Sequence, residues 1–274
     1  MNKPPEHTHA IKEKIPFSAW YLISLPLFIW VILYQNNWTT DVFLFLNQQF
    51  SVLPDLFWTT LSLGGNGWFI FVILLPVIYV APRVIFSALL SGIITGIVSN
   101  LAKSFFDTPR PAFVLDQASF HIIESPLLHS AMPSGHTMTA FAICTSIIFT
   151  ISRQNRKYVH LLWFLAIGTG LSRIAVGAHW PSDVLIGASF GIFCGLMGTS
   201  FINRMAATKF KTYSKASLIV NLMSLVNLYI LLNQKLDFAI NQPVQYLTAL
   251  FLTVNFIIYF IFYFKHQRLL KNHV

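Results

Sequence analysis

The chain has 274 residues, of which 55% are hydrophobic and only 10% are charged. Apolar stretches of about twenty residues recur along it, a pattern typical of a membrane protein with several spans and not of a soluble domain. The formal charge of +9 could suggest nucleic acid as a partner. The basic residues are, however, dispersed over short segments between apolar runs, as membrane topology requires, so nucleic-acid binding is excluded.

The apolar runs predict eight membrane spans. The first follows a polar segment, residues 1–16, and is too long for a signal-peptide core with no small-residue cleavage site after it, so we expect it to be uncleaved. Residues 41–53 are amphipathic and too short to cross, and we expect them to lie in the membrane interface. The spans cover approximately residues 17–34, 55–80, 84–106, 134–152, 158–176, 181–203, 216–232 and 246–264.

Small residues inside these runs indicate where helices break or approach each other. The stretch Gly64-Gly65-Asn66-Gly67 predicts either a break or a close contact within the second span. Glycines at four-residue spacing predict close helix packing in the third and sixth spans, at Gly92 and Gly96 and at Gly187, Gly191 and Gly195. Both cysteines, Cys144 and Cys194, fall inside predicted spans, where we expect them to be apolar packing residues without a disulfide.

The most informative stretch runs from Ser172 to Asp183, where an arginine, a histidine and a carboxylate lie together between two apolar runs. Charged groups near membrane depth are costly and usually line a polar site. His179 and Asp183 are four residues apart, which places them on one face if the segment is helical, and Pro181 suits the first turn of a helix.

Two other stretches carry complementary groups. The segment from Lys103 to Pro111 ends an apolar run with two cations, Lys103 and Arg110, and the residue before Pro109 is biased away from helical geometry. The second stretch, Pro133-Ser134-Gly135-His136, opens the fourth span with a small-residue turn and another imidazole. Three cations, two histidines and one carboxylate together predict a phosphate site with its own nucleophile.

These three stretches resemble the signature of the type 2 phosphatidic acid phosphatase family, which is K-x6-R-P, then P-S-G-H, then S-R-x5-H-x3-D. Every defining position matches in order, over roughly residues 55–203. Alone, Lys103 would be read as a lysine that reaches toward the membrane interface, and Arg110 as an anion contact in a loop. The spacing of all three motifs taken together favours assigning both residues to the family's phosphate site.

The resemblance implies roles for the matching residues. His179 would be the nucleophile that forms a phosphohistidine, Asp183 its orienting partner, and His136 the acid that protonates the departing alcohol. Physical reasoning agrees, because an imidazole bonded to a carboxylate is held in one tautomer with its other nitrogen free to attack. Phosphate oxygens would be bound by the side chains of Lys103, Arg110 and Arg173 and by the backbone amides of Ser134 and Gly135.

No metal or other cofactor is expected, because carboxylates do not cluster near the motifs and no short histidine spacing occurs. The residues between 112 and 132 have no strong period, and we expect a surface loop that covers or gates the site. No functional role is expected for the Asn37-Trp38-Thr39 tripeptide or for seven histidines, namely His7, His9, His121, His129, His160, His266 and His273.

The basic residues predict the orientation of the chain. With eight spans, one side of the membrane receives only Lys103, Arg110, Arg173 and Lys235. The positive-inside rule therefore places both termini in the cytoplasm and the site at the outer face of the cytoplasmic membrane. The expected divisions are a cytoplasmic segment 1–16, a six-span core 17–203, a basic cytoplasmic linker 204–215, two additional helices 216–264 and a cytoplasmic tail 265–274.

We therefore expect an all-α polytopic membrane phosphatase that removes a terminal phosphate from a lipid phosphate or lipid diphosphate. Its partners would be that substrate and membrane lipids, with no protein partner. Candidate substrates are undecaprenyl diphosphate, phosphatidylglycerophosphate, phosphatidic acid and the phosphates of lipid A, among which the motifs cannot choose. The alternatives are a lipid phosphotransferase with the same intermediate, an anion transporter, and the related vanadium-dependent haloperoxidases, against which the many spans argue.

Overall fold

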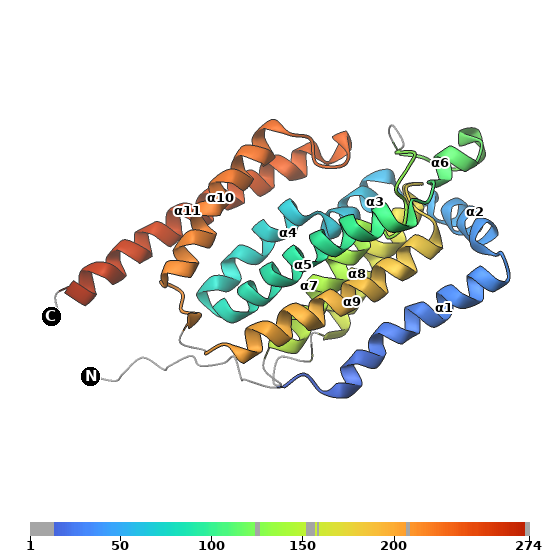
Figure 1. Ribbon diagram of the computed structural model, residues 1–274. Coiled ribbons are helices and arrows are strands. Elements are labelled where there is room, and N and C mark those ends of the chain that lie inside the picture. Colours follow the sequence, from blue (N-terminus) through green and yellow to red (C-terminus); the bar gives the residue numbers. More distant parts are fainter. Residues whose placement is uncertain (1–13, 124–126, 152–156, 158, 207–208, 272–274) are drawn as a thin grey trace.

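The computed structural model describes residues 14–123, 127–151, 157, 159–206 and 209–271 (Figure 1). Throughout these residues the regular structure is helical and no strand occurs, which confirms the predicted all-α fold. Several predicted features fall outside the described residues, namely most of the N-terminal segment with His7 and His9, residues 124–126 of the expected covering loop, and the end of the tail with His273.

Four helices form the centre of the molecule: α5 (Pro82–Phe106), α7 (Gly135–Thr150), α8 (Val159–Ala175) and α9 (Pro181–Arg204). They lie side by side (Figure 1), and α7 and α9 each pack against the other three. A 3-10 turn η1 (Phe17–Ile23) and helix α1 (Ser24–Gln35) pack on the outer side of α9.

The contact between α7 and α9 depends on the glycines of α9. A Cβ atom at Gly191 would lie 2.5 Å from the carbonyl oxygen of Met138, and one at Gly195 would lie 2.6 Å from that of Ala142. A Cβ at Gly187 would lie 2.9 Å from the Ser134 carbonyl oxygen. The two backbones are therefore too close for any larger residue, which confirms the packing face predicted for this helix.

The close contact predicted at Gly92 and Gly96 of α5 is wrong. A Cβ at Gly96 would meet no atom within 4 Å, and one at Gly92 would only touch Ile143 at 3.9 Å. The small residues that α5 turns inward are serines instead: Ser91 is buried and packs directly on Gly198 of α9. A four-residue glycine spacing gives no information about which face of the helix is buried, and in α5 the face that packs against α9 is the one that carries Ser91.

The glycine-rich stretch predicted to contain a break or a close contact contains both. Helix α3 (Asp55–Ser62) with η2 (Leu63–Gly65) meets α4 (Gly67–Leu74) with η3 (Leu75–Tyr79) at an angle of 75°. Asn66 caps α4, because its side chain accepts hydrogen bonds from the amides of Trp68 and Phe69. A Cβ at Gly65 would lie 2.5 Å from the His136 carbonyl oxygen, so the bend is pressed against the start of α7.

Within the part of the chain that the structure describes, five helical segments are long and apolar enough to cross a membrane, and the bent pair at residues 55–79 would make a sixth. Helices α7 and α8 are apolar but have only 16 and 17 residues. Each of the eight predicted spans thus has a helical counterpart, and the number that cross the membrane stays a prediction. The five segments are Phe17–Gln35, Pro82–Val114, Pro181–Arg204, Lys215–Asn233 and Ala239–Leu270.

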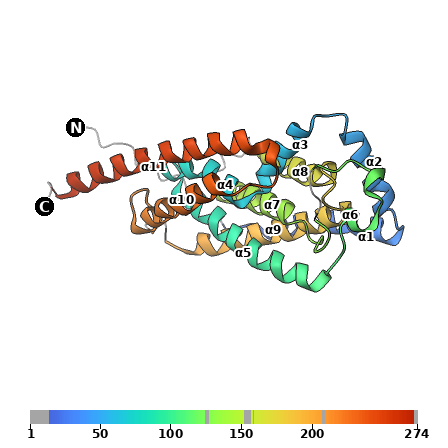
Figure 2. The same cartoon turned by 90° about the horizontal axis from the view of Figure 1, so that it is seen from above.

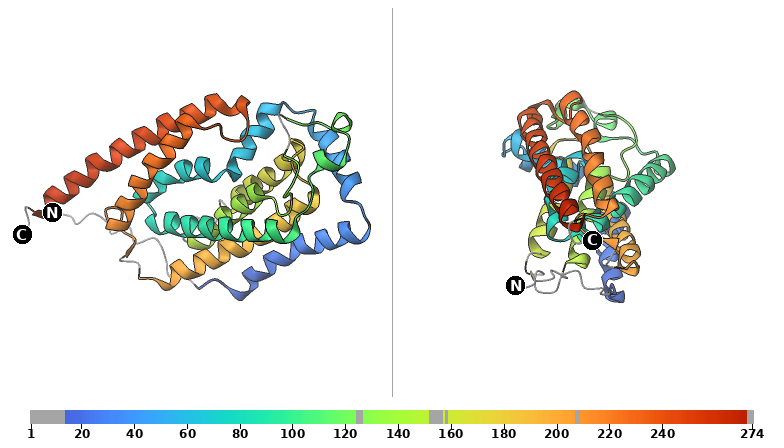
Figure 3. Two further views of the ribbon diagram at one scale, coloured as in Figure 1. Left: turned by 45° about the horizontal axis from the view of Figure 1, so that its top comes forward. Right: turned by 90° about the vertical axis from the view of Figure 1, so that its left-hand side faces the viewer.

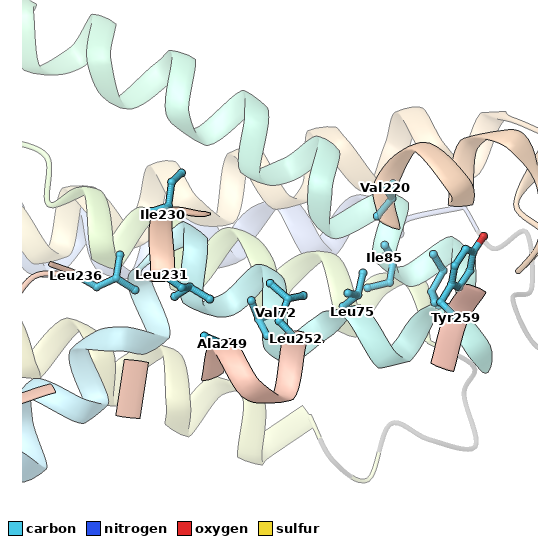
Figure 4. Close-up of a cluster of buried hydrophobic side chains, with 11 residues drawn as sticks. Val72, Leu75, Ile85, Val220, Ile230, Leu231, Leu236, Ala249, Leu252 and Tyr259 are labelled. Carbon is cyan, nitrogen blue, oxygen red and sulfur yellow. The ribbon is translucent and has the colours of Figure 1, made fainter. Parts of the chain in front are cut away.

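The two additional helices form a hairpin of α10 (Lys215–Asn233) and α11 (Gln242–Lys271), joined through the 3-10 turn η7 (Ala239–Asn241). The hairpin lies along α4 and one side of the central helices, and its loop points toward α3 (Figures 2 and 3). It is attached by an apolar cluster with α4, η3 and α5, in which Val72, Leu75, Ile85, Leu231 and Leu252 are buried (Figure 4).

Helix α2 (Thr39–Phe50) and the segment after α5 close the end of the molecule that carries the three motifs (Figure 1). That segment contains α6 (Pro111–Val114) and the turn η4 (Gln117–Ser119). Asn47 of α2 is fully buried and connects α2 to that segment and to α8. Its side-chain amide donates to the carbonyl oxygens of His121 and Ile174 at 3.0 Å, and its side-chain oxygen accepts from the His121 amide at 2.7 Å.

We expect the substitution Gly191→Ala to destabilise the protein, because the added methyl group overlaps the Met138 carbonyl and overpacking of this kind costs about 1–3 kcal/mol. The measurement is the midpoint of thermal unfolding in detergent, which should fall. Gly96→Ala is the matched control, since it adds the same methyl group to an open helical position and alanine is the better helix former. Equal midpoints for the two variants would contradict the role assigned to the α7–α9 contact.

Candidate active site

The three motif stretches meet at one end of the central bundle. Lys103 comes from the last turn of α5, and Arg110 precedes α6. Ser134 and Gly135 begin α7, with His136 in its first turn. Arg173 lies in the last turn of α8, and the chain then passes through His179 into Asp183 at the start of α9. Residues up to 80 positions apart in sequence are thereby brought to one place.

His179 and Asp183 form a buried pair. His179 Nδ1 lies 3.3 Å from Asp183 Oδ2, and the side chains are 3% and 1% exposed. The same carboxylate oxygen accepts from the amide of Trp180 at 2.9 Å, so Asp183 also caps the start of α9. Pro181 occupies the first turn of that helix, where the sequence predicted it. The carboxylate is thus fixed by the helix that carries it, and the imidazole ring is fixed by the carboxylate.

The guanidinium group of Arg110 lies against the other side of the His179 ring. Its terminal nitrogen Nη1 is 3.3 Å from His179 Nε2 and donates to the Ala178 carbonyl oxygen at 3.1 Å, and its Nε donates to the His129 carbonyl oxygen at 2.9 Å. An arginine can only donate hydrogen bonds, so His179 Nε2 is the acceptor in this contact. The proton of the neutral ring is then on Nδ1, which donates to Asp183.

Arg173 is buried between elements that lie outside its own motif. Its guanidinium donates to the hydroxyl group of Ser62 at the end of α3, and it stacks over the ring of Phe238 at 5.7 Å from the ring centre. The carbonyl oxygen of Arg173 accepts from the amides of Ala178 and His179 at 3.1 and 3.2 Å. One residue therefore connects the end of α8 to the turn that presents the histidine.

The predicted phosphate-binding amides differ in their surroundings. The Ser134 amide donates to the Asp183 carbonyl oxygen at 3.0 Å, and its hydroxyl accepts from Thr137 at 3.0 Å. This amide is therefore engaged within the protein and is not free to bind phosphate, which corrects the expectation for it. Gly135 lies in the first turn of α7, and a Cβ there would be 4.0 Å from Lys103 Nζ, so this residue lies beside that cation.

These groups line a cavity of about 230 Å³. Its polar lining consists of Lys103, Arg110, His136, Arg173, His179 and Asp237. Its apolar lining comes from the covering loop, from the residues before His179 and from the hairpin loop, and includes Ile122, Ile123, Leu127, Val176 and Phe238. The volume suits a small anion, and the apolar part offers contacts for an attached hydrocarbon group.

Asp237 is a site residue that sequence reasoning missed. It lies in the loop between α10 and α11, and its Oδ2 is 2.9 Å from His136 Nε2, with the side chains of the aspartate and the histidine 18% and 22% exposed. A signal was available, because the chain has only nine acidic residues and the predicted topology puts this loop on the same side as the motifs. Ser62 and Asn66, which also reach the site, had no such signal.

The charges around the cavity set the state of its two loop residues. Burial lowers the pKa of His179 well below its usual value of 6.5, and the positive charges of Arg110, Arg173 and Lys103 lower it further. For Asp237, burial alone would raise the pKa, but His136, Arg173 and the hydrogen bond from Asn66 outweigh it and lower the pKa to about 2. At neutral pH the cavity therefore holds a neutral His179 and an ionised Asp237.

The remaining histidines stay outside this cavity where they are described. His121 pairs with Asp55 at 2.8 Å near the surface, and the ring of His129 lies against Phe113. Among the described residues, no group of three or more histidine, cysteine or acidic residues is placed to hold a metal ion. The arrangement can bind a multiply charged anion, attack it with an imidazole and supply a proton from a second imidazole.

Known proteins resemble this chain in sequence and in fold. The sequence model of the PAP2 superfamily matches residues 83–206. A lipid A 1-phosphatase from Rhizobium johnstonii is 32% identical over 109 residues, which are 38% of this chain and 42% of that protein. The undecaprenyl-diphosphatase BcrC from Bacillus subtilis is 33% identical over 111 residues, which are 39% of this chain and 52% of that protein. The chain thus spans about half or less of these two relatives.

The crystal structure of LpxE from Aquifex aeolicus superposes with a TM-score of 0.51 and 28% sequence identity, covering 58% of this chain and 93% of that one. The residues of all three motifs fall inside the matched segment 83–206, whereas Ser62, Asn66 and Asp237 fall outside it. The resemblance found in the three motifs is therefore confirmed for the segment that carries them, because residues 83–206 match the PAP2 superfamily model.

Proposed function

We propose that the protein is an integral membrane phosphatase that hydrolyses a lipid phosphate or lipid diphosphate through a phosphohistidine on His179. One observation carries the proposal: an imidazole fixed by a buried carboxylate lies at a cavity that also holds three cations and a second imidazole. A cavity of about 230 Å³ with this lining is suited to a phosphoryl group.

In the first step the lone pair of His179 Nε2 attacks phosphorus. Arg110 contacts this nitrogen in the empty cavity and would turn to a phosphate oxygen when substrate is present, which frees the lone pair. Asp183 stabilises the positive charge that develops on the ring, because its carboxylate accepts the hydrogen bond from Nδ1. As the nitrogen–phosphorus bond forms, the bond from phosphorus to the leaving oxygen breaks, and His136 gives a proton to that oxygen.

In the second step a water molecule hydrolyses the phosphohistidine. His136, now neutral, accepts a proton from the water as its oxygen attacks phosphorus, and the bond electrons return to His179 Nε2. Lys103, Arg110 and Arg173 stabilise the charge on the phosphoryl oxygens in both steps. The products are inorganic phosphate and a lipid alcohol, or a lipid monophosphate when the substrate is a diphosphate. An acceptor alcohol in place of water would give the phosphotransferase.

The substrate class rests on the apolar part of the cavity and on the relatives. Ile122, Ile123 and Leu127 offer apolar contacts beside the cations, which suits a phosphate attached to a lipid. The named relatives are a lipid A 1-phosphatase and an undecaprenyl-diphosphatase. Purified protein should therefore be incubated with undecaprenyl diphosphate, phosphatidylglycerophosphate, phosphatidic acid and lipid A. Release of inorganic phosphate from at least one of them supports the proposal, and release from none of them contradicts it.

We also infer that the cavity faces the outside of the cytoplasmic membrane and that both termini are cytoplasmic. Helices α5 and α9 each carry a motif residue at one end and an arginine at the other: Lys103 opposite Arg83, and Asp183 opposite Arg204. These helices have 25 and 24 residues and rise by about 1.5 Å per residue, so the distance between their ends is roughly the thickness of a bilayer core. Basic residues outside the motifs favour the cytoplasmic side.

The substitution His179→Ala should reduce turnover by about a thousandfold or more, because it removes the nucleophile. Phosphate release from the preferred lipid is the measurement, and size-exclusion chromatography in detergent checks that the variant is folded. His121→Ala is the matched control, since it removes a histidine that is likewise paired with an aspartate but lies outside the cavity. Turnover of the His179 variant within tenfold of the control would refute the nucleophile.

Activity should persist in excess chelator and be blocked by vanadate. A phosphate monoester carries a charge of about −1.5 to −2, which Lys103, Arg110 and Arg173 can neutralise without a bound ion. Five-coordinate vanadate resembles the transition state, and transition-state analogues bind about 10² to 10⁸ times more tightly than substrate. Turnover is measured with chelator, with chelator plus magnesium, and with vanadate. Complete loss in chelator that magnesium restores would contradict the metal-free site, and indifference to millimolar vanadate would contradict the covalent histidine.

The orientation is tested with single cysteines, for which the chain is suited because both native cysteines are buried. Gln117→Cys, in the covering loop, should react with an impermeant thiol reagent added to intact cells or spheroplasts. Lys211→Cys, in the linker before α10, should react only after the membrane is opened. The reverse pattern would put the cavity on the cytoplasmic side.

A further inference from the structure

The loop between α10 and α11 brings a carboxylate into the cavity from outside the segment that matches the family. Asp237 Oδ2 is 2.9 Å from His136 Nε2, and the side-chain amide of Asn66 donates to the same oxygen at 3.0 Å. The next residue, Phe238, lies under the guanidinium of Arg173. Two consecutive residues of one loop thus contact two of the groups to which the proposed reaction assigns roles.

The loop is fixed on both sides of these residues. Asp237 has a φ of 51°, a left-handed conformation that is strained for a residue other than glycine and persists only where the surroundings impose it. Asn241 donates to the Thr59 carbonyl oxygen at 2.9 Å, and the Leu236 amide donates to the Gln245 side chain at 3.0 Å. Leu236 itself is buried in the apolar cluster that attaches the hairpin (Figure 4).

The charges that face His136 differ in sign. Burial disfavours a positive charge on its ring, and Arg173 from α8 and Lys103 from α5 oppose that charge further. His179, in the turn before α9, also faces it. Asp237 from the hairpin loop lies in direct contact and favours that charge. An acid catalyst in a cavity built to hold cations needs such a counter-charge, because the proton must be on the ring when the substrate arrives.

We propose that Asp237 is a positioning residue that keeps His136 protonated and oriented for transfer to the leaving oxygen, so that the α10–α11 hairpin completes the active site. An imidazolium ring has a proton on each nitrogen. Asp237 accepts a hydrogen bond from Nε2, which keeps its proton throughout, and the proton on the other nitrogen passes to the leaving oxygen as its bond to phosphorus breaks. The water that hydrolyses the phosphohistidine returns a proton to that nitrogen, which restores the imidazolium. This inference rests on the proposed function.

The decisive variant is Asp237→Asn, which removes the charge and retains an oxygen that can accept from both His136 and Asn66. Wild type and variant are purified in detergent, and kcat and KM are measured with the preferred lipid phosphate over about pH 4 to pH 9. Because the protonated form of His136 is required, activity falls as pH rises through its pKa, and loss of the carboxylate lowers that pKa. We expect the pH at which kcat falls on the alkaline side of its profile to be lower by about one unit in the variant. At pH values above that midpoint, the variant should then be about tenfold slower than wild type.

A second substrate separates proton donation from a structural effect. An aryl phosphate such as p-nitrophenyl phosphate has an acidic leaving group that departs without a proton, so acid catalysis matters little for it. The Asp237→Asn variant should lose about tenfold or more on the lipid phosphate and about threefold or less on the aryl phosphate. Asp237→Glu, which restores the charge on a longer side chain, should return the alkaline limb toward that of wild type.

Asp55→Asn is the matched control, because it removes the carboxylate of the other aspartate–histidine pair, which does not line the cavity. It should keep the wild-type profile. An unchanged alkaline limb in Asp237→Asn, or equal losses on both substrates, would overturn the inference, and so would higher activity with lower KM, which would make Asp237 a charge that repels substrate. If wild type releases phosphate from no lipid, the proposed function fails, which is a result distinct from these, and the role inferred for Asp237 fails with it.

Discussion

The structure depends on holding three cations around one small cavity at the end of an apolar bundle. Lys103, Arg110 and Arg173 repel each other and lose hydration when they converge, so each needs protein partners that do not cancel its charge. Backbone carbonyl groups meet this need for Arg110, and a hydroxyl group and an aromatic ring meet it for Arg173. These partners are neutral, which leaves the positive potential of the cavity available for an anion.

The two carboxylates at the cavity each pair with a histidine instead of a cation. Asp183 fixes His179 in the tautomer whose free nitrogen can attack, and Asp237 contacts His136. The two rings are in opposite states in the proposed reaction, one neutral and one protonated. Different surroundings can produce this difference, because His179 lies directly against Arg110, whereas the nearest charged partner of His136 is a carboxylate.

How much of this could be predicted follows from where each signal lies in the sequence. The motif residues have fixed spacings, and the structure brings residues of all three stretches to one cavity. The Ser134 amide differs from the prediction, because it donates to the Asp183 carbonyl oxygen and is not free for phosphate. The apolar runs of the sequence locate a helix in each of the eight predicted spans. Contacts between distant segments carry no local pattern, so the bonds from Ser62 and Asn66, and the inward serines that replaced the predicted glycine face of α5, could not be read from the sequence.

The position of the hairpin shows why the missing part of the site lies outside the family segment. Residues 83–206 supply every group that the resemblance assigned to the phosphate and to the nucleophile. The groups that contact Arg173 and His136 from outside come from the bent pair α3–α4 and from the α10–α11 loop, which the apolar cluster holds against each other. The apolar cluster, which includes the neighbouring Leu236, therefore helps to fix the distance between Asp237 and His136, together with the hydrogen bond from Asn66. Changes in that cluster would act on His136 through Asp237 and on Arg173 through Phe238, while leaving the His179–Asp183 pair in place.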